Sequence, residues 1–316
     1  MGSGRRLAGG LVGQTVPPMG QDRTTQHRST TEAAGTTPRA GAHVSRRGWQ
    51  QETLERGGDV AQIFLGNPRS WAAATPLGEA ERADTPLPHW VHTTYLANVC
   101  SENPEVRQRS VAALTQTLEA AAESGSSGVV VHAGQGGNQT IDETIRHWAD
   151  TIGHLAETLQ ATGTLLCVEN TASGKVAPGR ETQNMVRLAE TLKESGEQHE
   201  VAGQLAVCLD TCHSWAAGWH PEDHRRIAEM IRVPIVHLNG SRDPWGSGRD
   251  RHANLQDADS RQEADSRDPN RIPASWLQET LAAIQALGPI HLVCETPGGA
   301  EAQRADIETA RQLAGT

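Results

Sequence analysis

The stretch Leu205-Ala-Val-Cys-Leu-Asp210 is a short apolar run that ends in a carboxylate. Two similar runs precede it: Gly128-Val-Val-Val-His132 ends in a histidine, and Thr164-Leu-Leu-Cys-Val-Glu169 ends in a glutamate. Continuous apolar runs of this length are typical of strands buried on both faces of a parallel sheet. These runs therefore predict parallel strands that carry polar residues at their carboxyl ends.

Five further apolar runs bring the number of expected strands to eight: Ala42-His43-Val44, Ala61 to Leu65, Trp90 to Tyr95, Pro234 to Leu238 and Ile290 to Glu295. Amphipathic stretches between them predict helices at Pro104 to Glu123, Ile141 to Leu159, Glu181 to Lys193, Pro221 to Ile231, Pro273 to Leu287 and Glu301 to Leu313. The connection after Trp71 is short and interrupted by proline. Eight strands that alternate with helices, without an internal repeat, predict an α/β fold of the (β/α)8 TIM barrel type.

The length of 316 residues suits one such barrel, which typically needs about 250 residues. Residues 1–38 are rich in Gly, Thr, Arg, Gln and Ser and show no periodicity, so we expect a disordered N-terminal tail there. Residues 39–316 are expected to form a single barrel domain. The N-terminal part is basic, since residues 1–47 hold seven Arg against only Asp22 and Glu32, and we interpret the tail as a solubilising extension in preference to an arm that binds a polyanion.

The chain has 28 basic and 38 acidic residues, and the resulting charge of −10 argues against a nucleic-acid partner unless carboxylates hold cations. Five cysteines, an odd number, lie in or beside apolar runs, which indicates reduced thiols and a cytoplasmic protein. No stretch approaches the ~20 apolar residues that cross a bilayer, and the N-terminus lacks the apolar core of a secretory signal. We therefore expect no membrane association.

Residues of the types that bind metals recur at the ends of six successive expected strands and in the loops that follow them. They are His92, His132, Glu169, Asp210, His213, His237, Asp250, His252 and Glu295. Burying so many ionisable groups without cations would cost several kcal/mol for each one. A mixed nitrogen and oxygen set suits Zn²⁺, with Mn²⁺ or Fe²⁺ as substitutes. Nine ligands exceed the needs of one ion but could hold three ions if one carboxylate bridges two of them.

Other residues of the same types are expected to have no such role. His220 and His224 have the i, i+4 spacing of a helical zinc pair but lack the His-Glu-x-x-His pattern, so we expect both on the surface. His147 and His154 recur at helical spacing and are expected on a helix face. Cys212 is interpreted as a packed thiol in preference to a thiolate ligand.

Several strings in this chain resemble signatures of the endonuclease IV family. The two most specific are Cys208-Leu-Asp-Thr-Cys-His213 and the segment from His237-Leu-Asn to Asp250-Arg-His252. Further matches follow in the expected order: Gly41-Ala-His-Val-Ser45, Gln62 to Trp71, His92-Thr-Thr-Tyr95-Leu96, Val131-His132, Glu169-Asn-Thr-Ala and Glu295-Thr. The resemblance covers residues 40 to about 300.

This resemblance implies a trinuclear zinc site whose ligands divide into three groups. His92, His132 and Glu169 would hold one ion, and Glu169 would bridge to a second ion completed by Asp210, His237 and Glu295. His213, Asp250 and His252 would hold the third ion. The resemblance also implies that Arg69, Tyr95 and Leu96 contact DNA at the lesion.

The chain departs from the family pattern at two places. Gly240-Ser241-Arg242 stands where the family has an acidic residue, Ser and Lys, so a contact behind the ligands is expected to differ. Residues 256–269 form an acidic segment of low complexity where the family has a Gly-rich loop. An acidic segment beside DNA would repel phosphates and could alter substrate preference or rate.

The expected function is therefore that of a zinc-dependent apurinic/apyrimidinic (AP) endonuclease in base excision repair. It would hydrolyse the phosphodiester 5′ to an abasic site in double-stranded DNA, leave a 3′-hydroxyl and a 5′-deoxyribose phosphate, and trim 3′ blocking groups. Glu169 and Glu295 are the candidates to orient the attacking water, and a monomer is expected. Two alternatives stay open: a metal-dependent sugar isomerase or epimerase of related fold, and a barrel that binds DNA lesions or proteins without catalysis.

Overall fold

The computed structural model describes residues 1–2, 38–82, 87–255 and 272–315. The chain divides into two units, Met1–Gly35 and Thr36–Thr316, and the second unit contains the helices and strands described below. Most of the tail expected over residues 1–38 and all of the acidic segment 256–269 lie outside the described residues.

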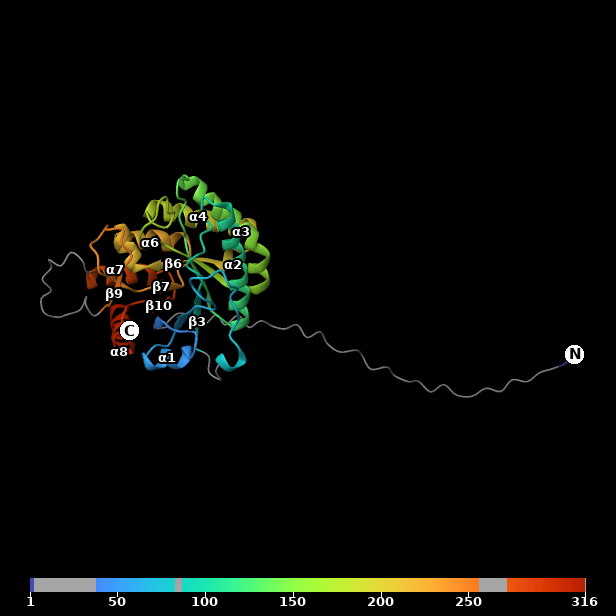
Figure 1. Ribbon diagram of the computed structural model, residues 1–316, viewed down its shortest axis with the longest axis horizontal. Coiled ribbons are helices and arrows are strands. Elements are labelled where there is room, and N and C mark those ends of the chain that lie inside the picture. The colour runs from blue at the N-terminus through green and yellow to red at the C-terminus, as the bar shows by residue number, and fades with distance from the viewer. Residues whose placement is uncertain (3–37, 83–86, 256–271, 316) are drawn as a thin grey trace. The chain divides into compact units, whose positions relative to one another are not determined.

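Eight parallel strands close into a barrel, as the sequence predicts (Figure 1). Around the barrel the order is β1, β10, β7, β6, β5, β4, β3 and β2, so neighbours along the chain are also neighbours in space. The strands are β1 (Arg39–His43), β2 (Ala61–Ile63), β3 (His89–His92), β4 (Gly128–His132), β5 (Leu165–Glu169), β6 (Leu205–Asp210), β7 (Ile235–His237) and β10 (His291–Cys294). The register pairs His132 with Glu169, and Asp210 with His237, so that polar strand ends lie side by side.

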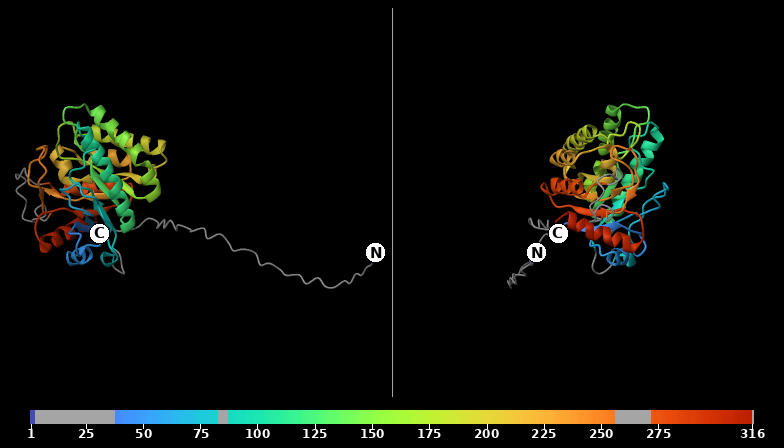
Figure 2. Two further views of the ribbon diagram at one scale, coloured as in Figure 1. Left: turned by 45° about the vertical axis from the view of Figure 1, so that its right-hand side comes forward. Right: turned by 90° about the vertical axis from the view of Figure 1, so that its left-hand side faces the viewer.

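Helices surround the strands (Figure 2). They are α1 (Trp49–Glu55), α2 (Pro104–Ser124), α3 (Ile141–Thr162), α4 (Thr182–Gln198), α5 (Thr211–Ala217), α6 (Pro221–Met230), α7 (Ala274–Gln285) and α8 (Ala300–Leu313). The six predicted helices are all present, within a few residues of their predicted bounds. Within the described part of the connection between β2 and β3, the only helical element is the 3-10 turn η1 (Glu79–Glu81).

Two helices, a hairpin and a 3-10 turn were not predicted. Helices α1 and α5 have seven residues each, and an antiparallel hairpin of β8 (Gly240–Ser241) and β9 (His252–Ala253) follows β7. A second 3-10 turn, η2 (Ala202–Gln204), precedes β6. In the part of the chain that is described, no helix is both long and apolar enough to span a membrane.

Local sequence signals fix the ends of the long helices. The Asn103 side chain accepts a hydrogen bond from Glu105 N at the start of α2, where Pro104 occupies the first helical position. Thr140 and Glu143 form a capping box at the start of α3. Both helices end at a glycine in the left-handed conformation, Gly125 and Gly163.

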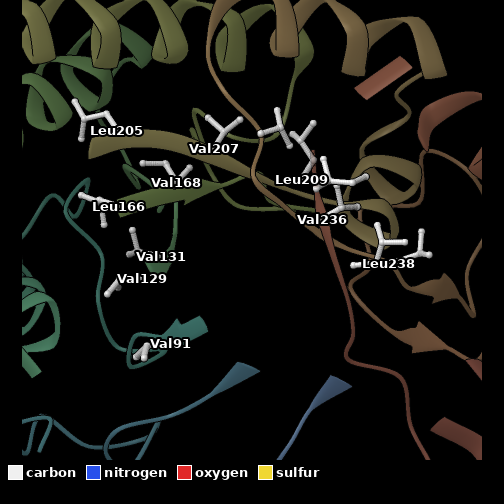
Figure 3. Packing of buried hydrophobic residues seen from close by; sticks show 14 of the residues in the cluster. Val91, Val129, Val131, Leu166, Val168, Leu205, Val207, Leu209, Val236 and Leu238 are labelled. Atoms are coloured by element: carbon white, nitrogen blue, oxygen red, sulfur yellow. The ribbon is translucent and has the colours of Figure 1, made fainter. Parts of the chain in front are cut away.

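Alternation along the strands divides the core into two layers. Leu205, Val207 and Leu209 of β6 belong to the large cluster between strands and helices, and Figure 3 shows them with the other residues of this layer. Ala206 and Cys208 belong to the smaller cluster inside the barrel. Side chains on a strand point alternately to its two faces, so one apolar run fills both layers and leaves its last residue for the barrel mouth.

The expectation that His220 and His224 both lie on the surface was wrong for His224. His220 is exposed, but it precedes α6 as its N-cap residue, so the i, i+4 spacing does not place the two rings on one helix face. His224 lies inside α6 and is fully buried. His147 and His154 lie on α3, partly and largely exposed, as expected of a helix face.

Candidate metal centre

The nine predicted ligands lie together at the carboxyl ends of the barrel strands and in the segments that follow them. Their potential ligand atoms fall into three groups in which all atoms lie within 4.8 Å of one another. The groups are His92, His132 and Glu169; Glu169, Asp210, His237 and Glu295; and His213, Asp250 and His252. These groups match the three ligand sets that the family resemblance implies.

Glu169 lies between the first two groups. Its Oε2 is 3.2 Å from His92 Nε2 and 3.4 Å from His132 Nε2, whereas its Oε1 is 2.8 Å from His237 Nδ1. The side chain is 1% exposed. Burial disfavours its charged form, but His237 and His132 outweigh burial and hold the pKa of Glu169 well below its usual range. The two oxygens of one carboxylate therefore face different groups, as a bridging ligand requires.

Backbone carbonyls fix which ring nitrogen carries the proton in three of the histidines. Nδ1 of His92, His213 and His252 lies 2.8, 2.9 and 3.1 Å from the carbonyl oxygens of Thr93, Asn170 and Glu295, respectively. A carbonyl only accepts hydrogen bonds, so each Nδ1 carries a hydrogen, and each neutral ring has its lone pair on Nε2. Nε2 of His92 faces Glu169, and those of His213 and His252 lie 3.2 and 3.1 Å from Asp250 oxygens.

Gln62 fixes which ring nitrogen of His237 carries the proton. Gln62 Nε2 donates to Glu295 Oε1 at 2.7 Å, because a carboxylate can only accept, and this leaves Gln62 Oε1 to accept from His237 Nε2 at 2.8 Å. The lone pair of neutral His237 is therefore on Nδ1, which faces Glu169. Sequence reasoning gave Gln62 no role, although it lies in β2 near the strand end, where the other ligands were found.

His43 was also missed as a member of the site. It is the last residue of β1, and its Nδ1 lies 2.8 Å from Glu295 Oε1. The position of His43 at a strand end is the signal that could have identified it.

These contacts test whether the residues suit a metal. In four neutral imidazoles, the nitrogen that carries the lone pair lies 2.8–3.2 Å from a carboxylate oxygen. Two such acceptors are stable at this distance only with a proton or a cation between them. Burial alone would lower the pKa of His237 and His252, but nearby carboxylates, Glu295 foremost for His237 and Asp250 for His252, raise both to about 9. The donor set therefore fits divalent ions such as Zn²⁺, which would replace these protons.

Two asparagines behind the ligands hold Asp210 and Glu295. Asn239 Nδ2 donates to Asp210 Oδ2 at 2.6 Å, and Asn239 Oδ1 accepts from Glu295 N at 2.8 Å. Asn170 Oδ1 accepts from Asp210 N at 2.7 Å. Asp210 is fully buried, and burial raises its pKa. Such contacts fix the directions in which ligand atoms point.

Two thiols lie near enough to join the groups. Cys208 is close to Glu169 and His237, and Cys212 is close to Asp210 and His252. Burial raises the pKa of both thiols, which favours the protonated form. Cys212 is fully buried, as expected for a packed thiol.

A cleft of about 490 Å³ opens beside the centre and is lined in part by Tyr95, Leu96, His132, His213 and Asp250. The Asp250 side chain is 49% exposed, so the third group of ligands faces the cleft most openly. Tyr95 is 51% exposed, and its ring packs edge-on against His92 with centroids 5.6 Å apart.

The exposed Arg69 lies in the loop after β2, next to the Tyr95 loop. The carbonyl oxygen of Pro68 accepts hydrogen bonds from Tyr95 N at 2.9 Å and from Thr94 Oγ1 at 2.8 Å. The structure thus brings the segments of the three predicted DNA-contact residues, Arg69, Tyr95 and Leu96, to one side of the cleft.

Known proteins are similar to this chain in sequence and in fold. A family model described as "Xylose isomerase-like TIM barrel" matches residues 51–313. A probable endonuclease 4 of Mycobacterium ulcerans is 40% identical over 68% of this chain and 82% of its own length. One from Mycobacterium leprae is 36% identical over 86% of this chain and 97% of its own length. The crystal structure of endonuclease IV from Thermus thermophilus matches with a TM-score of 0.65 and 29% identity, covering 87% of this chain and 98% of that one. The chain therefore belongs to the endonuclease IV family of xylose isomerase-like TIM barrels.

Proposed function

We propose that this protein is a zinc-dependent AP endonuclease that hydrolyses the phosphodiester on the 5′ side of abasic sites in double-stranded DNA. The products would be a 3′-hydroxyl and a 5′-deoxyribose phosphate, with removal of 3′ blocking groups as a second reaction of the same site. The observation that carries the proposal is the set of four imidazoles whose unprotonated nitrogens lie 2.8–3.2 Å from carboxylate oxygens. We place the protein in the cytoplasm, where it would act as a monomer in base excision repair.

Three divalent ions would occupy the three groups of ligands, with Glu169 shared between the first two. When bound, such ions lower the pKa of water and offset the negative charge that develops on a phosphate during hydrolysis. The protein supplies the fixed ligand directions, because the rings of His92, His213 and His252 are each held by a backbone carbonyl.

The exposure of Glu295 and Glu169 suits them to different roles. Glu295 is 17% exposed and is held by Gln62 and His43, so its carboxylate can orient a water molecule that enters from the cleft. Glu169 is 1% exposed and contacts histidines through both oxygens, which suits a ligand better than a group that touches substrate. Glu295 would hold the water by accepting a hydrogen bond from it, and Glu169 is the second candidate for this role.

Selectivity for abasic sites would come from the cleft and the loops beside it. Turning a nucleotide out of the duplex costs least where the base is already missing. Tyr95 and Leu96 line the cleft, and we propose that they fill the space left in the base stack. Arg69 would contact a backbone phosphate on the same side.

A sugar isomerase or epimerase is the second candidate, because the matching family model describes a xylose isomerase-like barrel. Such enzymes use one or two ions, whereas nine side chains converge here in three groups. Turnover of a ketose by protein that holds one or two ions would favour this alternative.

The direct test of the proposed reaction uses a duplex oligonucleotide that carries one tetrahydrofuran abasic analogue. Zinc-loaded wild-type protein should cut this strand on the 5′ side of the analogue and leave a 3′-hydroxyl that a polymerase extends. The control is Asp210→Asn, which has nearly the same shape and lacks the charge. No incision by the folded wild type, or equal incision by Asp210→Asn, would contradict the proposal.

A further inference from the structure

Behind the metal centre, a histidine that is not a candidate ligand is enclosed in the outer layer of the barrel. His224 of α6 is fully buried. Its ring lies 5.5 Å from that of Trp219 and 5.3 Å from that of Trp276, edge-on in both cases. This packing fixes the ring plane, so the directions of its two nitrogens are set by the fold.

Each ring nitrogen of His224 has a hydrogen-bond partner. Nδ1 lies 3.2 Å from the carbonyl oxygen of His220, and Nε2 lies 2.9 Å from Ser214 Oγ. Burial lowers the pKa of His224 to about 4, so the ring is neutral near pH 7. The contact with Ser214 connects α6 to α5.

Ser214 connects His224 to Asp210 and Asn170. Its hydroxyl donates to the carbonyl oxygen of Asp210 at 2.8 Å, and its Oγ accepts from Asn170 Nδ2 at 3.0 Å. Asn170 Nδ2 also donates to the Asp210 carbonyl oxygen at 3.2 Å. The four groups are therefore joined by hydrogen bonds that satisfy each buried polar atom of Ser214.

Asn170 contacts two candidate ligands from different groups. Its Oδ1 accepts from Asp210 N at 2.7 Å, and its backbone oxygen accepts from His213 Nδ1 at 2.9 Å. The first contact fixes the peptide that carries the Asp210 carboxylate, and the second fixes the proton of His213 on Nδ1. A buried chain of hydrogen bonds thus runs from α6 through α5 to the ends of β5 and β6.

We propose that His224 is a positioning residue that, through Ser214 and Asn170, holds Asp210 and His213 in the orientation that binds divalent cations. The inference rests on the proposed function in one respect, namely that these groups hold such ions. It adds that residues outside the ligand set determine how tightly the ions are held. Loss of a contact behind a metal ligand typically weakens metal binding about 10- to 100-fold.

The test measures Zn²⁺ affinity of the full-length chain by competition with a chromophoric chelator. His224→Phe keeps a ring between the two tryptophans and removes both nitrogens, and Ser214→Ala removes one oxygen. Each variant should bind its most weakly held Zn²⁺ about 10- to 100-fold less tightly than wild type does. The double variant should lose no more than either single variant, because both substitutions break the same chain.

Two further variants separate positioning from packing. His224→Gln offers an amide group near the place of Nε2, which can donate or accept, and should keep Zn²⁺ affinity within about threefold of wild type. His291→Phe removes a half-buried histidine, which accepts a hydrogen bond from Trp90 Nε1 away from the centre, and it should leave Zn²⁺ affinity unchanged. Thermal unfolding of the metal-free proteins would show that all variants are folded.

Unchanged Zn²⁺ affinity in folded Ser214→Ala would overturn the proposal, as would additive losses in the double variant. An equal loss of affinity in His291→Phe would also contradict it, because that result would indicate general destabilisation. These outcomes are independent of DNA cleavage. A protein that binds Zn²⁺ as described but does not cut abasic DNA would refute the proposed function and leave the role of His224 intact.

Discussion

Glu169 places one oxygen toward His92 and His132 and the other toward His237. Glutamine at this position keeps the size of the side chain but removes the charge and turns an NH₂ group toward one cation. We expect Glu169→Gln to bind fewer Zn²⁺ ions per chain and to cut abasic DNA about 100-fold more slowly. Elemental analysis after gel filtration measures the first effect.

The matched control for this substitution is Glu157→Gln, on the exposed face of α3. It should retain the metal content and rate of wild type. Full metal content in Glu169→Gln would show that Glu169 does not bridge two ions.

Substitution of Gln62 shows whether the tautomer of His237 affects catalysis, because the Gln62 amide contacts both His237 and Glu295. Gln62→Met keeps the volume and removes both contacts. We expect kcat to fall about 10- to 100-fold while KM for DNA changes little, since Gln62 is fully buried and cannot contact the duplex. Initial rates over a range of duplex concentrations separate the two constants, with the exposed Gln51→Met as control. An effect on KM alone would argue against this role.

At the scale of elements, one arginine holds the loop that carries Arg69. The Arg46 guanidinium donates to the carbonyl oxygens of Leu65, Thr75 and Pro76 and forms a paired contact with Glu81. This contact with Arg46 lowers the pKa of Glu81 to about 2. The loop between β2 and η1 is thus fixed by side-chain bonds where most barrels have a helix.

Arg46→Ala should therefore loosen the side of the cleft that we propose to bind DNA and spare the candidate metal centre. We expect KM for the abasic duplex to rise roughly tenfold, the equivalent of one hydrogen bond to a charged group, with kcat within about twofold of wild type. The neighbouring, exposed Arg47→Ala is the control for the loss of positive charge. A fall in kcat together with loss of Zn²⁺ would contradict this assignment.

The elements that could be predicted from the sequence are those whose periodicity extends over many residues. Helix α2 was expected from Pro104 to Glu123 and spans Pro104–Ser124, because proline and glycine mark its ends. Helix α5 was missed, since its seven residues begin directly after β6 and give too few turns for a pattern. The hairpin of β8 and β9 was missed for the same reason, as each strand has two residues.

The candidate ligands that could be predicted from the sequence are those that lie at the ends of strands. Glu169, Asp210 and His237 close their strands and were named on that basis. Gln62 and His224 were not, because their roles depend on the direction of hydrogen bonds between distant segments. No spacing in the sequence reports that His224 of α6 faces Ser214 of α5.

The whole molecule should lose stability in acid in part through its buried neutral histidines. Burial lowers the pKa of His224 to about 4, against 6.5 for an exposed histidine. Because the pKa of His224 is lower in the folded than in the unfolded state, its protonation does not reduce the free energy of unfolding above pH 6.5. Between pH 6.5 and pH 4 the free energy of unfolding falls by on the order of 3 kcal/mol.

Urea unfolding of metal-free wild type and His224→Phe at pH 7 and pH 4.5 measures this contribution. Comparing the two proteins cancels the opposite effect of His237 and His252, whose raised pKa values favour the folded state at low pH. We expect the free energy of unfolding to fall less between the two pH values in the variant. An equal fall in both proteins would show that His224 does not stay neutral in the folded state.

We propose that this barrel cuts abasic DNA with three ions held by nine side chains. The most direct test counts Zn²⁺ per chain in the same preparation that cuts a duplex with one tetrahydrofuran site, by native mass spectrometry alongside the incision assay. We expect three ions per chain and cleavage on the 5′ side of the lesion. Full cleavage by protein that holds only one or two ions, or three ions without cleavage, would contradict it.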